Sequence, residues 1–555
     1  MSENELDENK VVEQTDAPVA DEPVTVPSPY KGFAAKLDKF FGIRKKGSTF
    51  RAEIIGGLVT FMAMVYILMV NANMFAAPGI NFLADDNVTV VAIWNVFGAH
   101  DPAAFAEASK AAYGAIYIAT ALSAIIGTML MAFLARMPLA QASGMGLNAF
   151  FVYTVCLGFG LSYANALVLV LIDGVVFIIL TVTGLRKVLF NAIPKVVRVA
   201  IPAGIGLFIA FIGLQNVGLV VGDGATLVKL ASFNVLPAKM GGSATWGSIA
   251  PLLVTVCGII AVAVLSKKNV RGAMLYSILG GAGLYWIFMA IGYGAGDVAC
   301  KAVIDGFSFS NPIDAFKNWG KMSVGQVFAN GFNFDGYLAT HNGASLALVI
   351  ITSALAFCMV DMFDTMGTLY GACARGNMLE KDGSIPNINN SMLCDAVATT
   401  AGAIAGTSTV TTFVESSAGI GAGARTGLAA LVTGLCFFVA MFLSPIAEMI
   451  PSAATSIALI YVGVLMMNCV REIEWTDAAE AVPAFLTIAM MPLTYNISYG
   501  IAFGIISWLL IRVFVDLISL VKKSDSETVA QPKEKISVVT VVIAVLFILM
   551  FFLTH

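Results

Sequence analysis

Long apolar segments alternate with short polar loops through most of the chain. A helix that crosses a bilayer needs about 20 mostly apolar residues, and on this measure the segments form about fourteen spans in two groups of about seven. With an odd number of spans in each group, the second group has inverted topology. The pattern therefore predicts an all-α polytopic membrane protein with spans at roughly 52–75, 113–135, 144–160, 163–183, 194–218, 247–266 and 271–294, and then at roughly 346–374, 391–406, 412–424, 427–450, 452–470, 477–495 and 497–520.

The polar stretches set the boundaries between the predicted units. The two seven-span units occupy 52–294 and 346–520, with an extracellular loop at 295–345 between them. An acidic tail at 1–30 has the composition of a disordered segment. Residues 31–51 are basic and contain Phe33, Leu37, Phe40 and Phe41, which predicts an amphipathic helix at the membrane interface. Residues 521–555 form a charged linker and an apolar segment, 536–553, which could span the membrane or lie at its interface.

Lysine and arginine residues are concentrated in alternate loops. If the N-terminus is cytoplasmic, most of these residues fall on the cytoplasmic side, from Arg44 and Arg136 through Arg271 to Arg375 and Arg471. This distribution follows the positive-inside rule. We therefore expect a multi-pass protein of the cell membrane with its N-terminus in the cytoplasm.

The composition excludes several other classes of protein. The chain has 555 residues, of which 58% are hydrophobic and 12% charged, whereas soluble domains have about 25% charged residues. The net charge of −4 gives no basic surface for nucleic acid. The three histidines and eight cysteines show no metal-like or catalytic spacing. We expect neither an enzyme nor a metal or organic cofactor.

Two predicted spans do not resemble continuous helices. The third begins with the polar, glycine-rich stretch 141–148, and the tenth contains the glycine-, serine- and threonine-rich stretch 406–423. Thr407–Val414 is β-prone, and a half-helix should follow near Glu415 or Ser416. Irregular backbone at membrane depth is tolerated only where it is buried in protein or lines a cavity. Broken segments at matching positions of two halves indicate the binding site of a transporter.

Three carboxylates in apolar segments are the strongest candidates for chemistry. Asp361 and Asp364 are i, i+3 on the eighth span, and Glu415 lies at the break of the tenth. Such groups are costly in a membrane and generally functional. A desolvated carboxyl group can take up a proton near neutral pH, and a carboxylate can accept hydrogen bonds from ring N–H groups. Free N–H groups at the half-helix starts, 145–148 and 415–418, would add donors and complete a nucleobase-shaped pocket.

Structural roles remain open for several of these side chains. Asp364 could bond Thr368 or a neighbouring helix, and Asn148 could cap its half-helix. Phe413 could stack on a planar ligand or pack in the core. Asp173, in the middle of the fourth span, has no partner motif, so packing or a local hydrogen bond is expected there.

Three motifs resemble those of a known family. They are Gly144-Met-Gly-Leu-Asn-Ala-Phe-Phe, Val360-Asp-Met-Phe-Asp-Thr-Met-Gly-Thr-Leu-Tyr, and Phe413-Val-Glu-Ser-Ser-Ala-Gly-Ile with the following Arg425-Thr-Gly. Together they are similar to motifs of the AzgA-like purine permeases, a branch of the nucleobase–cation symporters that include uracil and xanthine permeases. The resemblance covers about residues 48–515. One departure is Ser143, where many members have proline.

The resemblance implies a fold of fourteen spans in two inverted repeats. Spans 1–4 and 8–11 would form a core domain and spans 5–7 and 12–14 a gate domain, with short antiparallel strands in spans 3 and 10. Substrate would bind between these strands and span 8. The residues implied at the site are Asp361, Glu415, Gly146, Asn148 and Phe413, with Ser416 beside Glu415; Asp364 would replace Asp361 if the alignment slipped.

The resemblance also implies an activity. Members import adenine, guanine and hypoxanthine with protons, so Glu415 and Asp361 are the implied proton carriers and the proton is the coupling ion. Related transporters form homodimers through the gate domain. The alternatives are a uracil or xanthine permease and, with a lower expectation, an anion transporter of related fold, whose substrate two carboxylates would repel.

Overall fold

The structure, a computed structural model, describes residues 31–76, 102–185, 193–234, 244–307, 309, 311–380, 384–521 and 536–553. The acidic tail predicted at 1–30 lies outside the described residues, as does most of the charged linker that follows residue 521.

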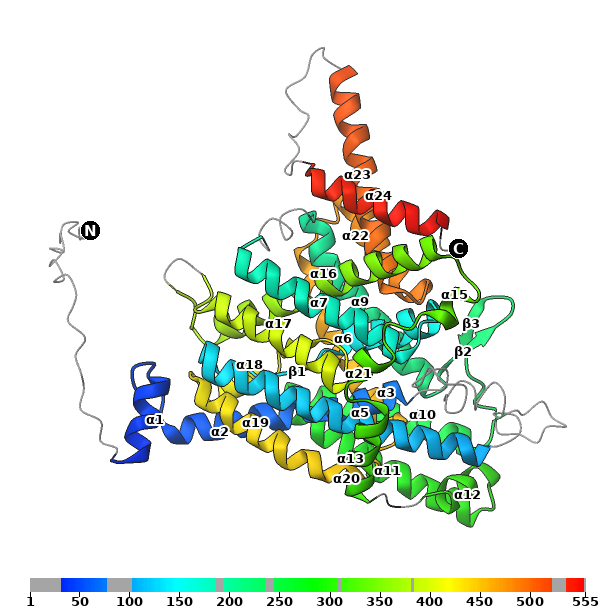
Figure 1. The fold of residues 1–555 in the computed structure, drawn as a ribbon. Helices are drawn as coiled ribbons and strands as arrows, with labels where there is room; N and C mark the ends of the chain where they lie inside the picture. The colour runs from blue at the N-terminus through cyan, green and yellow to red at the C-terminus, as the bar shows by residue number, and fades with distance from the viewer. Residues whose placement is uncertain are drawn as a thin grey trace, which may run out of the picture.

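The first half of the chain runs from α1 to α11 and contains both strands of one small hairpin (Figure 1). Its elements are α1 (Phe33–Phe41), α2 (Phe50–Met64), α3 (Tyr66–Phe75), α5 (Pro102–Leu130), the π-helical η2 (Met131–Ala135), β1 (Gln141–Ser143), α6 (Met145–Ala149), the π-helical η3 (Phe150–Gly158), α7 (Tyr163–Thr183), α9 (Lys195–Asn216), β2 (Val220–Asp223), β3 (Leu227–Leu230), α10 (Trp246–Lys267) and α11 (Ala273–Gly294).

Short helices of the connecting loop precede the second half of the chain. They are α12 (Val298–Asp305), α13 (Pro312–Met322), α14 (Gln326–Ala329) and α15 (Asp335–Leu338). The second half comprises α16 (Gly343–Arg375), α17 (Ile388–Ala405), β4 (Val410–Thr412), α18 (Ser416–Gly421), α19 (Gly427–Ala440), the 3₁₀ turn η5 (Met441–Leu443), α20 (Ser444–Ala447), α21 (Ser452–Met466), the 3₁₀ turn η6 (Met467–Glu472), α22 (Ala478–Leu493), α23 (Ile497–Val521) and α24 (Val538–Leu553).

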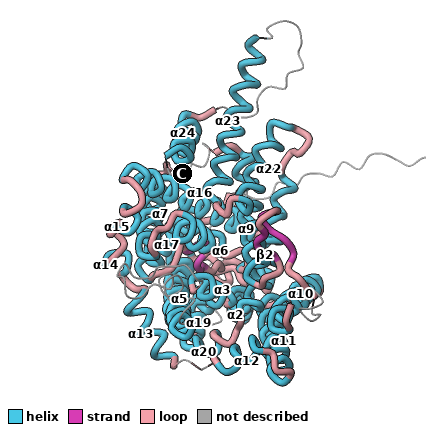
Figure 2. Tube along the Cα trace, turned by 90° about the vertical axis from the view of Figure 1, so that its right-hand side faces the viewer, coloured by secondary structure: helices cyan, strands magenta, loops and turns pink. Residues whose placement is uncertain are grey.

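The all-helical membrane fold predicted from the hydrophobic pattern is confirmed. Within the described residues, 10 helices are long and apolar enough to cross a membrane, and shorter apolar helices accompany them. Twelve of the fourteen predicted spans correspond to such a helix, whereas the ninth is the less apolar α17 and the tenth is the strand β4 followed by the short helix α18. The third span also contains a strand followed by a short helix. Figure 2 shows how little of the described chain is strand.

The helices pack into two groups. In the first, which we call the strand-bearing group, α5 contacts α3, α17 and α19, and α7 contacts α16 and α17. In the second, the α9–α21 group, α9 contacts α21 and α22, α10 contacts α11 and α21, and α22 contacts α23. Figure 1 shows α5, α7, α17 and α19 running nearly parallel across the view. The groups meet where α3 contacts α21 and where α6 contacts α9.

Strands β1 and β4 cross near the middle of the strand-bearing group. They pair antiparallel, with Gln141 opposite Thr412 and Ser143 opposite Val410. All six strand residues are buried. Each strand is too short to form a stable sheet alone, so the surrounding helices hold the pair in place. The antiparallel strands expected in spans 3 and 10 are therefore present.

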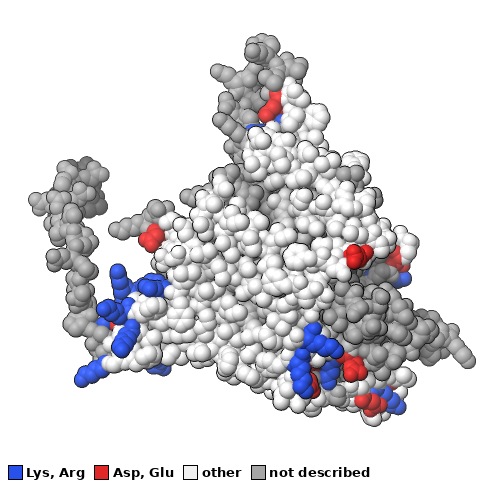
Figure 3. Space-filling model, viewed as in Figure 1, with Lys and Arg blue, Asp and Glu red and all other residues white. Residues whose placement is uncertain are grey.

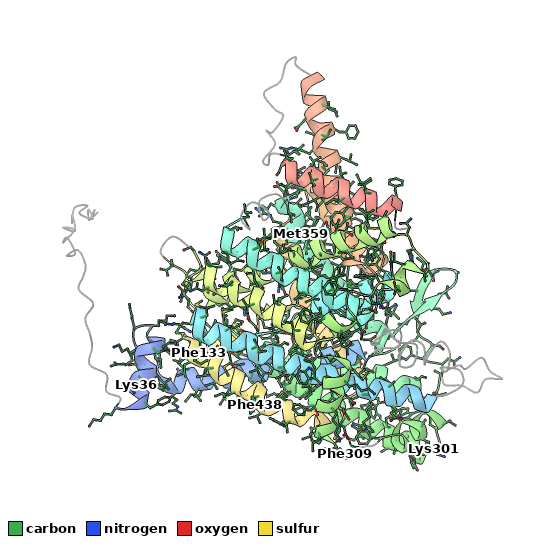
Figure 4. The ribbon with its side chains drawn as sticks, in the orientation of Figure 1. Lys36, Phe133, Lys301, Phe309, Met359 and Phe438 are labelled. Atoms are coloured by element: carbon green, nitrogen blue, oxygen red, sulfur yellow. The ribbon has the colours of Figure 1, made fainter. Side chains whose placement is uncertain are left out.

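Charged side chains mark the two ends of the spans. Figure 3 shows lysines and arginines gathered around α1, a mixed group of charges at the opposite end, and a broad uncharged band between them on this face. Residues such as Phe438 on α19, which is 50% exposed, populate the band (Figure 4). A broad band of exposed apolar side chains without charges is typical of a surface that faces lipid.

Helix α1 packs against the protein at the end of the spans where the lysines and arginines gather. Phe41 is buried against Ile43 and Leu428, and the Arg136 guanidinium lies 4.5 Å from the centre of the Phe40 ring. Phe33 remains 75% exposed. One apolar face of α1 therefore packs on the protein and part of it stays available to a membrane surface.

Helix α24 packs against α16 and α23, and its Phe547 is fully buried. This packing accounts for part of its strongly apolar sequence.

Candidate functional site

A small cavity, about 80 Å³ in volume, lies where the two helix groups meet beside the crossed strands. One wall comes from the strand-bearing group and the other from α9 and α21. The lining residues are Gly144, Met145, Gly146, Val360, Asp364, Thr368, Thr411, Thr412, Phe413, Val414 and Glu415 on the first wall, and Ile205, Val462 and Met466 on the second.

The two aspartates of α16 have different surroundings although they are one turn apart. Asp364 lines the cavity, and its Oδ2 accepts a hydrogen bond from Thr411 Oγ1 at 3.3 Å. Asp361 does not line the cavity and is fully buried near the carboxylates of Asp173 and Asp395. Residues i and i+3 are about 60° apart around a helix, which is enough to send them to different neighbours. At this cavity the wall residue is thus Asp364, whereas the resemblance implies Asp361 as the substrate residue.

Glu415 lines the cavity at the junction of β4 and α18. Its Oε1 accepts a hydrogen bond of 2.6 Å from the hydroxyl of Tyr66. Tyr66 is fully buried at the start of α3, directly after Val65, where the helical run of the first span is interrupted. The hydrogen bond thus fixes the carboxylate between the first span and the cavity.

The start of α6 lies at the cavity. The first N–H groups of a helix have no acceptor within it, and Met145 and Gly146 both line the cavity. The corresponding expectation for α18 is wrong. Its first three amides are used in a tight turn, where they donate at 2.9–3.1 Å to the carbonyl oxygens of Phe413, Val414 and Glu415.

Asn148 and Ser416 stabilise the strand crossing and do not line the cavity. Asn148 Oδ1 accepts hydrogen bonds from the hydroxyls of Ser143, at 2.6 Å, and Ser408. Ser416 Oγ accepts a 3.0 Å bond from the amide of Ala140. Gly144, not Asn148, is the N-cap residue of α6. The side chain expected as a cap or a ligand instead joins the two broken spans to each other.

Gly146 and Phe413 shape the cavity. A Cβ atom on Gly146 would lie 2.6 Å from Cγ2 of Ile205 on α9, so only glycine allows α6 and α9 to approach this closely. Phe413 is 6% exposed and forms part of the wall next to Glu415. Gly146 and Phe413 therefore line the same cavity as the carboxylates of Asp364 and Glu415.

Sequence reasoning missed Tyr66, Thr411 and Ile205. Tyr66 lies in a span with no proline or charge near the helix interruption, so nothing in the sequence marks it. Thr411 lies in the threonine-rich stretch, whose composition indicated a strand but not which hydroxyl would reach Asp364. Ile205 comes from a distant span, and only the packing brings it to Gly146.

A second, larger cavity of about 250 Å³ lies elsewhere between the two groups. It is lined by polar residues from α3, α5, η3, α9 and α21, including Asn73, Ser109, Tyr153, Asn216 and Thr455. It shares no lining residue with the small cavity and contains no carboxylate.

The small cavity combines acceptors and donors at close quarters. Asp364 and Glu415 supply carboxylate oxygens, Thr368 and Thr411 supply hydroxyls, and α6 supplies main-chain N–H groups. Carboxylates accept from ring N–H and amino groups, whereas N–H groups donate to carbonyl oxygens and ring nitrogens. The arrangement suits a flat heterocycle with both kinds of group at its edge. The described residues include no cluster of three or more His, Cys, Asp or Glu side chains that could hold a metal ion.

Comparison with known proteins gives a consistent result. Residues 101–503 match the model of the Permease family, Xan_ur_permease. The chain is 35% identical to the guanine/hypoxanthine permease PbuO of Bacillus subtilis, over 85% of this chain and 94% of that protein. It is 32% identical to the adenine permease AdeP of Escherichia coli, over 86% of this chain and 90% of that protein.

A solved structure with a similar fold is the transmembrane domain of the cyanobacterial bicarbonate transporter BicA. The TM-score is 0.51 at 13% sequence identity, and the alignment covers 81% of this chain and 97% of that one. At this identity the likeness concerns the fold alone.

Proposed function

The chain belongs to the permease family of xanthine and uracil permeases, and from this membership we propose that it imports purine nucleobases across the cell membrane. Relatives named as guanine/hypoxanthine and adenine permeases support purines as the substrate class. The observation that carries the proposal is the cavity that Asp364 and Glu415 line together with Met145 and Gly146 at the start of α6.

We propose one role for each residue at the cavity. Asp364 and Glu415 accept hydrogen bonds from the N–H and amino groups of the purine. The amides of Met145 and Gly146 donate to its ring nitrogens or carbonyl oxygen, and Phe413 stacks on its face. Asn148 and Ser416 position the two half-helices and do not contact substrate.

We propose that import is driven by proton symport, with the proton as coupling ion and no other cofactor. Glu415 and Asp361 are the two candidate carriers. A neutral carboxyl group crosses a water-poor intermediate state at lower cost than a carboxylate. If Glu415→Gln still accumulates purine in response to a proton gradient, Glu415 is excluded as the obligatory carrier.

Alternating access is the transport mode that fits the two helix groups. The cavity has one wall from each group, so a movement of the strand-bearing group, as core, against the α9–α21 group, as gate, would open it to either side. The bases around α1 support a cytoplasmic N-terminus. The α9–α21 group is the proposed homodimer surface.

The proposed units keep the boundaries read from the sequence. They are the interfacial segment 31–51, the repeats 52–294 and 346–520, and the loop 295–345.

A uracil or xanthine permease is the second candidate, because the matched family is named for those substrates. The same carboxylates could accept hydrogen bonds from a pyrimidine or an oxidised purine. A competition assay is therefore needed to distinguish these substrates from adenine, guanine and hypoxanthine. An anion carrier is disfavoured, since two carboxylates at the cavity would repel an anion.

Uptake of labelled adenine, guanine, hypoxanthine, xanthine and uracil tests the proposal in cells that lack their own nucleobase permeases. We expect purine uptake that a protonophore abolishes, and loss of uptake in Asp364→Asn. Uptake of uracil or xanthine alone would replace the proposal by its alternative. No uptake of any base, by protein that is folded in the membrane, would refute both.

A further inference from the structure

The larger cavity, of about 250 Å³, lies toward the end of the spans that is opposite to α1. Its lining comes from helix ends: Asn73 lies in the last turn of α3, Asn216 is the last residue of α9, and Ser452 is the first residue of α21. Figure 1 shows the hairpin of β2 and β3, which follows α9, on the side opposite to α1. With the N-terminus in the cytoplasm, as proposed above, this cavity, which we call the outer cavity, faces the extracellular side.

The lining of the outer cavity is polar and uncharged. The described residues that line it include two asparagines, a tyrosine, two serines and a threonine, and no Asp, Glu, Lys, Arg or His. Asn216 and Ser452 are exposed at its mouth, whereas Tyr153 and Thr455 are buried. A cavity without a charged group selects an uncharged ligand, because an ion would lose its hydration without gaining an opposite charge.

The polar groups of the outer cavity include both donors and acceptors. Nδ2 of Asn73 is buried and donates to no acceptor in the described part of the protein. Ser109 Oγ already donates to the carbonyl oxygen of Ala76 at 3.0 Å. Thr455 Oγ1 likewise donates to the carbonyl oxygen of Ser452 at 3.2 Å. A hydroxyl group whose proton is engaged keeps lone pairs that accept hydrogen bonds, so a free amide donor and hydroxyl acceptors line the same cavity.

Tyr153 contributes an aromatic ring that the α9–α21 group holds in place. Its ring packs edge-to-face on that of Tyr495, with centroids 5.5 Å apart, and Tyr495 packs in the same way on Phe208 at 5.3 Å. The Tyr153 hydroxyl interacts with the side chain of Asn216. Aromatic side chains stack on heterocyclic bases without strong preference for one base. An aromatic ring with amide and hydroxyl groups around it suits an uncharged nucleobase.

The outer cavity and the small cavity lie one after the other along the boundary between the two helix groups. The α21 residues that line them follow each other along the helix, with Ser452, Thr455 and Leu459 at the outer cavity and then Val462 and Met466 at the small one. Steps of three and four residues keep these side chains on one helix face, and Leu459 to Val462 is a rise of only about 4.5 Å. On α9, Ile205 lines the small cavity and Asn216 the outer one. The third span contributes Gly146 to the small cavity and Tyr153 to the outer one.

We propose that the outer cavity is a second nucleobase-binding site, which takes up an uncharged base from the extracellular side and passes it along α21 to the small cavity. The inference rests on the proposed purine import and deepens it. Asn73 and the hydroxyl groups bind the edge of the base, and Tyr153 contacts its ring. Because amide and hydroxyl groups pair with many arrangements of donors and acceptors, the outer cavity accepts adenine, guanine and hypoxanthine alike, and the small cavity selects among them.

The test measures uptake of labelled adenine, guanine and hypoxanthine by purified full-length protein in liposomes. Asn73→Leu removes the amide donor and keeps a side chain of similar size. A site on the entry path changes the rates of capture and release together, so KM can rise while the equilibrium Kd does not. We expect KM for uptake to rise about fivefold, with kcat and the Kd for purine within about twofold of wild type. Met74→Leu is the matched control and should keep the wild-type KM, because Met74 lines the same cavity without a hydrogen-bonding group to lose.

The outcomes separate this inference from the proposed function. If wild type neither binds nor carries any of the three purines, the proposed function itself fails. If wild type carries purine and Asn73→Leu has the wild-type KM, the outer site is overturned while purine import stands. A lower kcat together with a weaker Kd in Asn73→Leu would assign Asn73 a structural role and would also overturn the outer site.

A second measurement on wild type decides the question even if the variant does not fold. On illumination, 8-azidoadenine becomes attached to nearby side chains, and mass spectrometry locates the products. We expect attachment in both cavities, at Tyr153 or Thr455 in the outer one, and suppression of both products by excess adenine. An absence of attachment at the outer cavity, with or without attachment at the small one, would overturn the proposal.

Discussion

At the scale of single residues, the site depends on a hydrogen bond that joins the first span to the tenth. Tyr66 holds Glu415 at the cavity through a 2.6 Å bond in a fully buried position. Hydrogen bonds to a charged group contribute about 1.5–3 kcal/mol. Much of the carboxylate's orientation therefore rests on a phenol that does not itself line the cavity.

Tyr66→Phe should weaken purine transport while leaving the fold intact. Loss of the bond frees Glu415 to leave its binding orientation, and we expect KM for purine uptake to rise about tenfold, equivalent to about 1.4 kcal/mol. Tyr117→Phe is the matched control, since it also loses a buried phenol bond, a 2.8 Å contact to the carbonyl of Ala440. Equal KM values for Tyr66→Phe and wild type would show that this bond does not position the carboxylate.

The sequence pattern narrowed the acid on α16 to two residues, and only the resemblance favoured Asp361 over Asp364. Asp361 and Asp364 share one broad helix face, so both satisfied the pattern. Which of the two reaches the cavity depends on how α16 is rotated against β4 and α7, and packing among helices far apart in the chain sets that rotation. Glu415 was predictable because it stands alone at the end of the β-prone stretch.

At the scale of elements, the close approach of α6 and α9 is the contact most sensitive to side-chain size. Gly146→Ala should reduce transport strongly, because its Cβ would lie 2.6 Å from Ile205 Cγ2 and force the two helix groups apart. We expect Gly146→Ala/Ile205→Ala to recover most of the activity, because the second change removes the clashing atom. Initial rates of purine uptake at matched surface expression would measure both effects. Failure of the double variant to exceed the single one would mean that Gly146 serves another purpose.

The N-terminus of α19 is capped from another helix. The fully buried Glu53 of α2 accepts hydrogen bonds from the amides of Arg425, Thr426 and Ala429 at 2.8–3.3 Å. Glu53→Met leaves these donors unsatisfied and should cost about 1–3 kcal/mol.

We expect the melting temperature of purified Glu53→Met to fall by a few degrees, with the KM of the remaining folded protein unchanged. Glu107→Met, at an exposed position of α5, should melt like wild type. A Glu53→Met protein as stable as wild type would show that the cap contributes nothing measurable.

The elements themselves were largely predictable, and their pairing was not. Apolar runs of span length gave the helices, and the threonine-rich stretch gave β4. The register that sets Gln141 opposite Thr412 depends on tertiary contacts, including the bonds of Gln141 to Asp395 and Thr412. The free amides expected at α18 were missed because a tight turn before the helix uses them.

At the scale of the whole molecule, transport requires the two helix groups to move relative to each other. Met62 of α2 and Gly272 at the start of α11 lie on opposite sides of the boundary between the two helix groups. A Cβ atom on Gly272 would be 3.5 Å from the Cβ atom of Met62. This separation falls within the range of about 3.5–4.5 Å found in disulfides.

The pair Met62→Cys/Gly272→Cys should therefore form a cross-link that stops transport. We expect oxidation to abolish purine uptake by the double variant and a reductant to restore it, while each single variant responds like wild type. Because Gly272 has φ +76°, its replacement alone will cost some stability, so rates are compared before and after oxidation of the same sample. Full uptake by a quantitatively cross-linked protein would exclude relative motion at this boundary.

Binding of labelled adenine, guanine and hypoxanthine to purified wild type, Asp364→Asn and Asp361→Asn tests the central claim most directly. The claim is that purines bind at the crossed strands through the cavity carboxylates, with Asp361 outside the substrate site. It predicts saturable binding of at least one purine to wild type, at least tenfold weaker binding to Asp364→Asn, and nearly normal binding to Asp361→Asn. Normal binding to Asp364→Asn together with lost binding to Asp361→Asn would contradict it.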